Sequence, residues 1–287
     1  MKSLKWQGMA AVLALGLSAL PAQAIVVTSE TDANALAAAL LAGGGAGIDL
    51  GSVVVSVSNH TSGSAVSSGT YTNASNTYGI GNGIVLSSGN VLNYGDGPNT
   101  ASGTTTAYGV AATAAEEALL DPITGGALNH NDVTSITMTF NLLPGFDSVF
   151  FNIVFGSEEW PEFAGSSFID AFGLFVNGTN VAFANGNPIN IDHPDMVAQA
   201  GTELDGMLGG STGGFGQFVH TFGTFVGDGA MGVTVTFIIA DSGDSSLDST
   251  VYISQLGGSA PPPPVPAPAA ALLIAGGLLL LGRKRQR

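Results

Sequence analysis

The sequence predicts an all-β body, an antiparallel β-sandwich or jelly-roll-like domain with one short N-terminal helix, flanked by terminal signal and anchor helices. Glycine is frequent (42 of 287 residues) and only 9% of residues are charged, which is typical of β-rich proteins with many turns. Apolar and polar residues alternate in segments such as 135–140 and 233–239. The body, residues 25–258, is long enough for one large β domain or two small ones.

The first half of the body predicts few regular elements. Thr31-Asp32 precedes an Ala/Leu-rich stretch, residues 33–42, and Gly43 follows it, which predicts a capped helix and the only substantial one. Residues 62–83 are rich in Ser, Gly, Thr and Asn and predict turns. The remaining expectations are strands over 48–57 and 84–86, a loop over 93–108, and at least one helical turn within 111–120.

The second half of the body is more regular. Residues 149–155 are apolar on both faces, which predicts a central strand. Asn177-Gly178 lies between two apolar segments, 171–176 and 180–184, and is a strong signal for a type I′ hairpin. Further strands are predicted over 136–140, 215–226, 233–239 and 251–253.

The charges divide the chain into three parts. All six basic residues lie within the first five or the last five positions, and all 21 acidic residues lie between them. Residues 1–24 predict a secretory signal peptide, with Lys2 and Lys5 ahead of an apolar run. Ala22-Gln23-Ala24 is a small-x-small cleavage site, so we expect export and cleavage after Ala24.

The C-terminus has a layout of three parts. A proline-rich linker, residues 259–268, precedes residues 269–287, an apolar helix with a basic end at Arg283-Lys284-Arg285. This layout resembles the PEP-CTERM class of sorting signals, and most closely its VPLPA-CTERM variant, with Ala267 in place of the usual Leu. The resemblance implies a Gram-negative bacterium, insertion in the inner membrane before processing, and an exosortase-type enzyme as partner. A plain anchor that is retained is the alternative, and both place the body outside the cytoplasm.

Composition excludes several classes of function. Cysteine is absent, so the exported body has no disulfide and no thiolate metal site. The lack of Lys and Arg within the body argues against nucleic acid as a partner. The four histidines, His60, His130, His193 and His220, are widely spaced and form no zinc motif.

Carboxylates concentrate in two segments. One runs from Phe155 to Phe163 and is followed by Asp170; the other runs from Asp241 to Asp248. Oxygen-rich loops without a basic partner suit a hard cation, so we predict a calcium site. Its candidate ligands are Glu158, Glu159, Asp170, Asp241, Asp244 and Asp248. Two alternatives stay open: solvated acidic turns, and a pair of catalytic carboxylates like those of glycosidases.

The same segments resemble a known family. Ser157-Glu158-Glu159 followed by an aromatic residue is similar to the signature of the choice-of-anchor L domain, with Trp160 where that family usually has Tyr. Residues 168–175 resemble its next block, with Ile169 in place of Asn, and residues 83–89 and 240–253 resemble its first and last blocks. The blocks span residues 30–256 in the family's order. The resemblance implies an exported surface protein with no established activity.

These observations predict a non-catalytic protein rather than an enzyme. We expect it to be displayed at the cell surface or in the extracellular matrix, with a role in adhesion or in the exopolysaccharide layer. The alternative is a polysaccharide-binding or polysaccharide-cleaving protein that uses Glu158, Glu159 and Asp170. An open groove with exposed aromatic residues such as Trp160 would favour this alternative, whereas buried carboxylates would favour a structural role.

Overall fold

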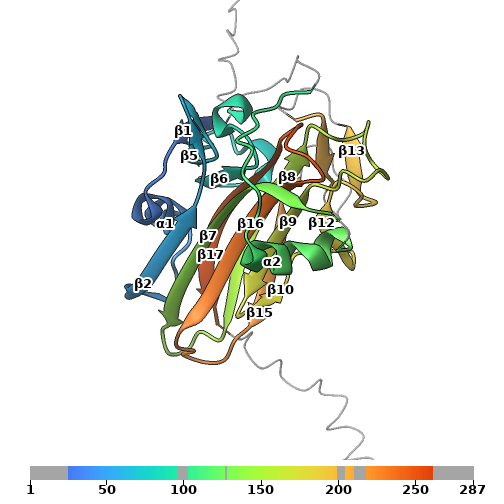
Figure 1. Ribbon diagram of the computed structural model, residues 1–287. Coiled ribbons are helices and arrows are strands. Elements are labelled where there is room, and N and C mark those ends of the chain that lie inside the picture. Colours follow the sequence, from blue (N-terminus) through green and yellow to red (C-terminus); the bar gives the residue numbers. More distant parts are fainter. Residues whose placement is uncertain (1–24, 96–102, 127, 199–203, 210–217, 261–287) are drawn as a thin grey trace, which may run out of the picture.

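Two antiparallel β-sheets form the body of the molecule (Figure 1). The structure, a computed structural model, describes residues 25–95, 103–126, 128–198, 204–209 and 218–260. Over these residues the first sheet has eight strands, in the order β1-β5-β6-β17-β8-β14-β13, with β15 also paired to β8. Its strands are β1 (Val26–Ser29), β5 (Ser68–Thr72), β6 (Gly83–Ser87), β8 (Ser148–Ser157), β13 (Met196–Ala198), β14 (Gly206–Leu208), β15 (His220–Phe225) and β17 (Ser249–Ser259).

The second sheet has seven strands within the same described ranges. Their order is β11-β12-β9-β16-β7-β2, with β10 paired to β9. These strands are β2 (Ile48–Ser58), β7 (His130–Leu142), β9 (Ala171–Val176), β10 (Thr179–Asn180), β11 (Phe183–Ala184), β12 (Asn187–Asn190) and β16 (Val233–Ser242). A small separate ladder joins β3 (Thr61–Ser62) to β4 (Ala65–Val66). The helical elements are α1 (Ala33–Ala42), η1 (Thr77–Gly79), η2 (Val91–Tyr94) and α2 (Ala114–Thr124).

The main apolar core lies between the two sheets. Alternate residues of each strand point into it, since successive side chains of a strand face opposite sides of the sheet. From the second sheet, Phe237 on β16 packs edge-on against Phe151 on β8 of the first sheet, with ring centroids 5.6 Å apart. Both side chains are fully buried. The predicted sandwich of antiparallel sheets is therefore confirmed by a shared core to which both sheets contribute.

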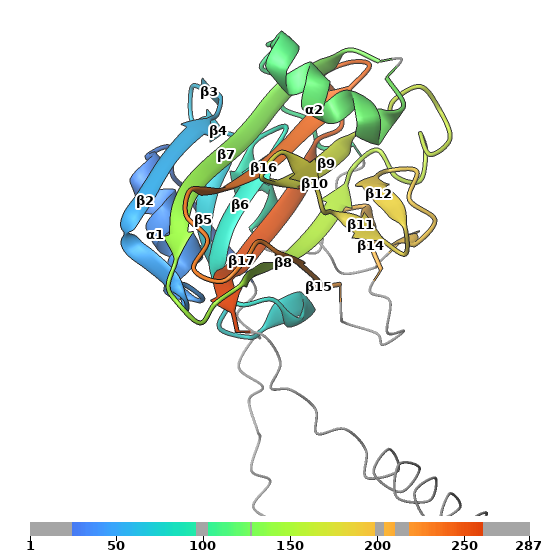
Figure 2. The ribbon, with the colours of Figure 1, turned by 90° about the horizontal axis from the view of Figure 1, so that it is seen from below.

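The two α-helices cover different parts of the sandwich. α1 is capped by Asp32, whose side chain accepts a 2.8 Å hydrogen bond from the Ala35 N–H, and it packs against β17, β6 and β2. α2 begins with a capping box in which Thr113 and Glu116 satisfy each other's backbone N–H groups. It packs mainly against β9 and β12 of the second sheet. Figure 2 shows α1 beside β2, and α2 beside β7 and β9.

Most of the predicted elements are present. The helix over 33–42, the central strand β8 and the hairpin between β9 and β10 are confirmed. Asn177 (φ 50°) and Gly178 (φ 80°) both have the positive φ that a type I′ turn requires. Residues 220–225 of the predicted strand 215–226 form β15, and residues 215–217 lie outside the described residues.

Two predictions were wrong. α1 is not the only substantial helix, because α2 has 11 residues against 10 in α1, and its capping box begins it only at Ala114. Residues 62–83 are not only turns, because β5 lies within them and pairs with both β1 and β6. Its Ser and Thr residues carry no apolar alternation, so the ladder with its neighbours defines this strand rather than its own sequence pattern.

The predicted signal and anchor helices, residues 1–24 and 269–287, lie outside the described residues. Within the part of the chain that the structure describes, we find no helix with the length and apolar character needed to span a membrane.

Candidate functional site

The two acidic segments of the sequence meet at one end of the sandwich. β8 ends directly before Glu158 and Glu159, and β17 begins directly after Asp248. β9 begins directly after Asp170, and β16 carries Asp241 near its end. Because β16 runs antiparallel to β9, and β17 antiparallel to β8, the end of one strand lies beside the start of its neighbour. We call these five residues the carboxylate cluster.

The carboxylate cluster is buried. Asp170, Asp241 and Asp248 are 0% exposed, and Glu158 and Glu159 are each 2% exposed. Residues 25–260 contain neither Lys nor Arg, so no strong cationic side chain can balance these groups. Burying a carboxylate is costly unless hydrogen bonds, a proton or a bound cation compensates it. The partners of each carboxylate oxygen therefore decide what the cluster can do.

Two members of the cluster fasten a loop. Asp248 accepts hydrogen bonds on both oxygens, from the Thr106 N–H at 2.8 Å and from the Tyr94 hydroxyl at 3.0 Å. Glu158 accepts one from the Thr104 N–H at 3.2 Å. Both backbone donors belong to residues 103–113, which we call the cover segment. One oxygen of Asp248 and one of Glu158 thus attach the cover segment to this end of the sandwich, and Tyr94 holds the second oxygen of Asp248.

Asp132 attaches the same cover segment and was missed by the sequence analysis. It is 0% exposed and accepts hydrogen bonds from the N–H groups of Tyr108 (2.9 Å), Gly109 (3.2 Å) and Val110 (2.7 Å). Its φ of 51° is left-handed, a conformation that Asp tolerates better than most residues. The dipeptide Asn131-Asp132, near the start of β7, was the signal in the sequence that could have identified this residue, because both residue types favour turns and bulges.

Asp170 is partly satisfied within the sheets. One oxygen accepts a hydrogen bond from the Ser242 N–H at 3.0 Å, and the other accepts one from the Ser249 hydroxyl at 2.8 Å. Each carboxylate oxygen has two lone pairs, so each oxygen of Asp170 can accept one further ligand.

Asp241 and Glu159 differ from the rest of the cluster. Neither oxygen of Asp241 has a hydrogen-bond partner among the described residues, and the same is true of Oε2 of Glu159. Ser88 lies close enough to influence Asp241, but its hydroxyl donates to the Ser249 carbonyl at 3.4 Å and accepts from the Ser249 N–H at 2.9 Å. The Asp241 carboxyl instead contacts the carboxyl of Asp170, and two carboxylates can hydrogen-bond to each other only when one of them is protonated. In its ionised form, Asp241 therefore lacks a donor other than Ser88 among the described residues.

The pKa values of the cluster are raised. Burial raises the pKa of Asp241 well above its usual range, and the charge of Asp170 raises it further. Burial also raises the pKa of Asp170, against the lowering effect of its hydrogen bond from Ser249. Burial raises the pKa of Glu159 to about 10, with Asp170 adding to the effect. For Asp248, burial raises the pKa to about 6 despite the hydrogen bond from Thr106. The ionised cluster is thus costly without a counter-charge.

Asp244, the sixth predicted ligand, is not part of the buried cluster. It is half-buried, and its Oδ1 accepts a 2.9 Å hydrogen bond from the Ser246 N–H two residues on. This is the self-capping turn that the solvated alternative predicted for the acidic loop. Its charge contributes to the raised pKa of Glu159, so it lies near the rim of the cluster.

A second group of titratable residues lies beside α2. His130, Glu117 and Asp121 could by position share a metal ion. However, Nδ1 of His130 contacts Glu117 Oε2 at 2.5 Å, and Nε2 contacts the Thr124 hydroxyl at 3.1 Å. Both ring nitrogens are therefore engaged, and this group fastens α2 to the start of β7.

Glu117→Gln is expected to remove part of the acid sensitivity of the fold. Although burial raises the pKa of Glu117, the hydrogen bonds from His130 outweigh it and hold the pKa below its usual value. A carboxyl group with a lowered pKa in the folded state contributes stability above its usual pKa of about 4.3, which is lost as the pH falls through the folded pKa. Urea unfolding should show a wild-type advantage at neutral pH that shrinks in acid. A difference that stays constant with pH would contradict this interpretation.

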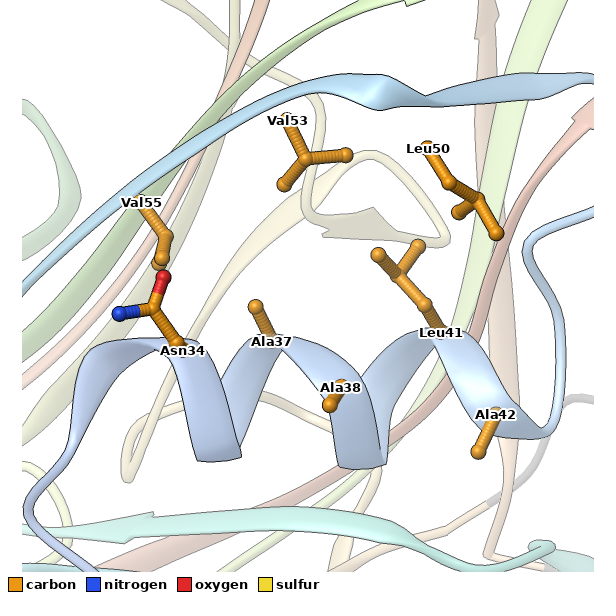
Figure 3. Close-up of a pocket in the computed structure, with 8 residues that line it drawn as sticks. All are labelled: Asn34, Ala37, Ala38, Leu41, Ala42, Leu50, Val53 and Val55. Atoms are coloured by element: carbon orange, nitrogen blue, oxygen red, sulfur yellow. The ribbon is translucent and has the colours of Figure 1, made fainter.

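Two cavities lie in different surroundings. One, of about 270 Å³, is lined by Gly103, Glu158, Glu162, Phe163, Asp205 and Leu247, beside the cluster. The other, of about 420 Å³, lies between α1 and β2, where Leu41, Leu50 and Val53 converge (Figure 3). The second cavity is lined by aliphatic side chains and Asn34 and contains no titratable group. Only the first can take part in chemistry that involves the carboxylates.

Comparison with known proteins gives one match. The model of the choice-of-anchor L domain matches residues 25–201, which is more than half of the chain and includes Glu158, Glu159 and Asp170. No curated protein and no solved structure matches the chain.

Proposed function

Because the chain belongs to the choice-of-anchor L domain family, which indicates a surface-associated protein, we propose that it is a non-catalytic protein displayed at the cell surface or in the extracellular matrix of a Gram-negative bacterium. Its role there is adhesion or association with the exopolysaccharide layer. The observation that supports this proposal best is the burial of the carboxylate cluster. Three of its members are 0% exposed, and Asp248 and Glu158 each accept a hydrogen bond from a backbone N–H of the cover segment.

The position of the chain's end supports the proposed display. β17 ends at Ser259, which pairs with Ser148 at the start of β8. The carboxylate cluster lies at the other end of these two strands. The described chain therefore leads into the proposed linker and anchor from the end of the sandwich opposite the cluster.

Removal of residues 261–287 is expected to release the protein from the membrane fraction. By analogy with the PEP-CTERM layout, we propose that this tail halts export in the inner membrane, where an exosortase-type enzyme recognises it. The truncated chain should be exported into the periplasm and remain soluble there, because it lacks the segment that we propose as the anchor. Immunoblots of membrane, periplasmic and medium fractions measure this outcome.

Mass spectrometry of the mature wild-type protein provides the matched test. We expect an N-terminus at Ile25 and a C-terminus upstream of Arg283, with the intact tail present only in a strain without the processing enzyme. A mature wild-type protein that retains Arg283-Lys284-Arg285 would contradict the processing step. A truncated chain that still sediments with the membrane fraction would contradict the anchoring role.

One observation favours the alternative, a polysaccharide-binding or polysaccharide-cleaving protein. The cavity of about 270 Å³ contains Glu158, Glu162 and Asp205, with Phe163 beside them. Burial raises the pKa of Asp205, and the charge of Glu162 adds to the shift, which is the direction that a general acid requires. Hydrolysis of a polysaccharide that is abolished by Asp205→Asn or Glu159→Gln would replace the non-catalytic proposal.

A further inference from the structure

At the end of the sandwich that holds the carboxylate cluster, acidic residues replace apolar ones at the positions that face the core. On β16, Asp241 follows Phe237 and Ile239 in the alternation that points into the core, and on the strand partner β9, Asp170 precedes Phe172 in the same way. The first sheet contributes Ser249, whose hydroxyl reaches Asp170, and Glu159, just beyond the end of β8. Asp170 contacts Asp241 and lies near enough to Glu159 for its charge to act on that group. Among the described residues, oxygens of all three carboxylates do not lie within 4.8 Å of one another, so an ion that all three bind requires the Glu159 side chain to turn towards Asp170.

We propose that this region binds one Ca²⁺ ion, with Asp241, Asp170 and Glu159 as its protein ligands. The set is narrower than the six residues that the sequence analysis predicted. Asp248 and Glu158 accept hydrogen bonds from the cover segment, and Asp244 lies at the rim of the carboxylate cluster and caps its own turn. The inference does not depend on how the chain is anchored or processed.

The main evidence for a calcium ion is the set of carboxylate oxygens that lack a hydrogen-bond donor. Asp241 is fully buried and presents two carboxylate oxygens without a hydrogen-bond partner among the described residues, and Glu159 presents a third. Buried polar atoms are almost always satisfied, so each such atom requires an explanation. A cation bound by Asp170 and Asp241, which are already in contact, and reached by a turn of the Glu159 side chain would satisfy these oxygens together.

The charge balance points to the same ligand. Residues 25–260 supply no Lys or Arg that could balance these three carboxylates in their ionised form. Burial raises the pKa of each, so without a cation they hold protons, which a bound cation would displace. A divalent cation would offset most of the negative charge of the ionised form.

The donor chemistry selects calcium. All three ligands are carboxylates, which hard cations prefer, and Ca²⁺ accepts irregular sets of 6–8 oxygens at about 2.3–2.6 Å. Mg²⁺ demands near-ideal octahedral geometry and gives up its water reluctantly, which suits a buried region poorly. The ring nitrogens of His130, the histidine beside this end of the second sheet, are engaged by Glu117 and Thr124. Zinc therefore has no nitrogen ligand here.

Thermal unfolding of the full chain, purified in detergent, tests the assignment. Ca²⁺ at about a hundredfold its dissociation constant should raise the Tm of the wild type by about 5–10 °C over EDTA. Asp241→Asn should abolish this shift. In EDTA, the Tm of Asp241→Asn should be equal to or above that of the wild type, because Asn does not have to take up a proton to remain buried and neutral. Glu159→Gln should reduce the shift independently.

Asp228→Asn is the matched control. Asp228 is exposed near the opposite end of β16, where it accepts a hydrogen bond from the Gly145 N–H, so this variant should keep the full calcium shift. Absence of a shift in the wild type would overturn the site. A shift that survives both Asp241→Asn and Glu159→Gln would place the ion elsewhere, and an equal shift with Mg²⁺ would overturn the choice of calcium.

Discussion

Gly89→Ala is expected to destabilise the fold by about 3 kcal/mol or more, at the upper end of the cost of overpacking. A Cβ at Gly89 would lie 1.7 Å from Oδ2 of Asp248. That carboxylate cannot move away freely, because Tyr94 and Thr106 hold its two oxygens. Chemical denaturation should show the loss as a lower midpoint. Retained wild-type stability would mean that the side chain of Asp248 does not lie against this loop.

Gly81→Ala is the matched control, because Gly81 precedes β6 and Gly89 follows the same strand. A Cβ there would meet only Nε2 of Gln255, at 3.7 Å, and Gly81 does not have a positive φ. This change should be neutral or stabilise by about 0.4–1 kcal/mol, because Ala restricts the unfolded chain. The contrast between the two variants isolates contact with Asp248 from the general effect of replacing glycine.

Asp132→Ala is expected to detach the cover segment. Three backbone N–H groups, those of residues 108–110, would lose their acceptor. The cost should be about 2–4 kcal/mol, because these donors are partly reachable by water. Hydrogen exchange should show faster exchange of the amides of Tyr108, Gly109 and Val110, and denaturation should show the lower stability.

Asp132→Asn provides the graded comparison. Asn keeps one acceptor oxygen and tolerates the left-handed φ of 51° at this position, so its loss should be smaller than that of Ala. Equal losses for the two variants, with unchanged exchange at residues 108–110, would contradict the anchoring role of Asp132.

The sandwich could be predicted because its strands carry local patterns. The alternation along β7 and β16, the two-sided apolar run of β8 and the Asn177-Gly178 turn each depend only on neighbouring residues. β5 was missed because its pairing with β1 and β6, rather than its own residues, makes it a strand. Likewise, α2 was underestimated because its start depends on the capping box of Thr113 and Glu116.

The candidate site could be predicted in composition but not in the partners of its members. The two acidic segments flank the ends of predicted strands, so their convergence was a reasonable expectation. Which carboxylates are already satisfied depends on distant residues: Thr106 and Asp248 are separated by 142 positions. For the same reason, Asp132 could not be distinguished from an ordinary turn residue.

The structural role of the cluster also explains why a surface protein without Lys or Arg in its body retains buried acids. Asp132, Asp248 and Glu158 attach the cover segment, whereas the cation that we propose at Asp170, Asp241 and Glu159 would join the two sheets. It would lie at the end of the sandwich opposite Ser259.

Elemental analysis of the protein, isolated without chelator from the cells that make it, would show directly whether the cluster binds calcium. We expect one calcium per chain for the wild type and for Asp228→Asn, and none for Asp241→Asn. A wild-type protein that is folded, stable and free of calcium would contradict this expectation, because the unpartnered oxygens of Asp241 and Glu159 would then be balanced by bound protons alone.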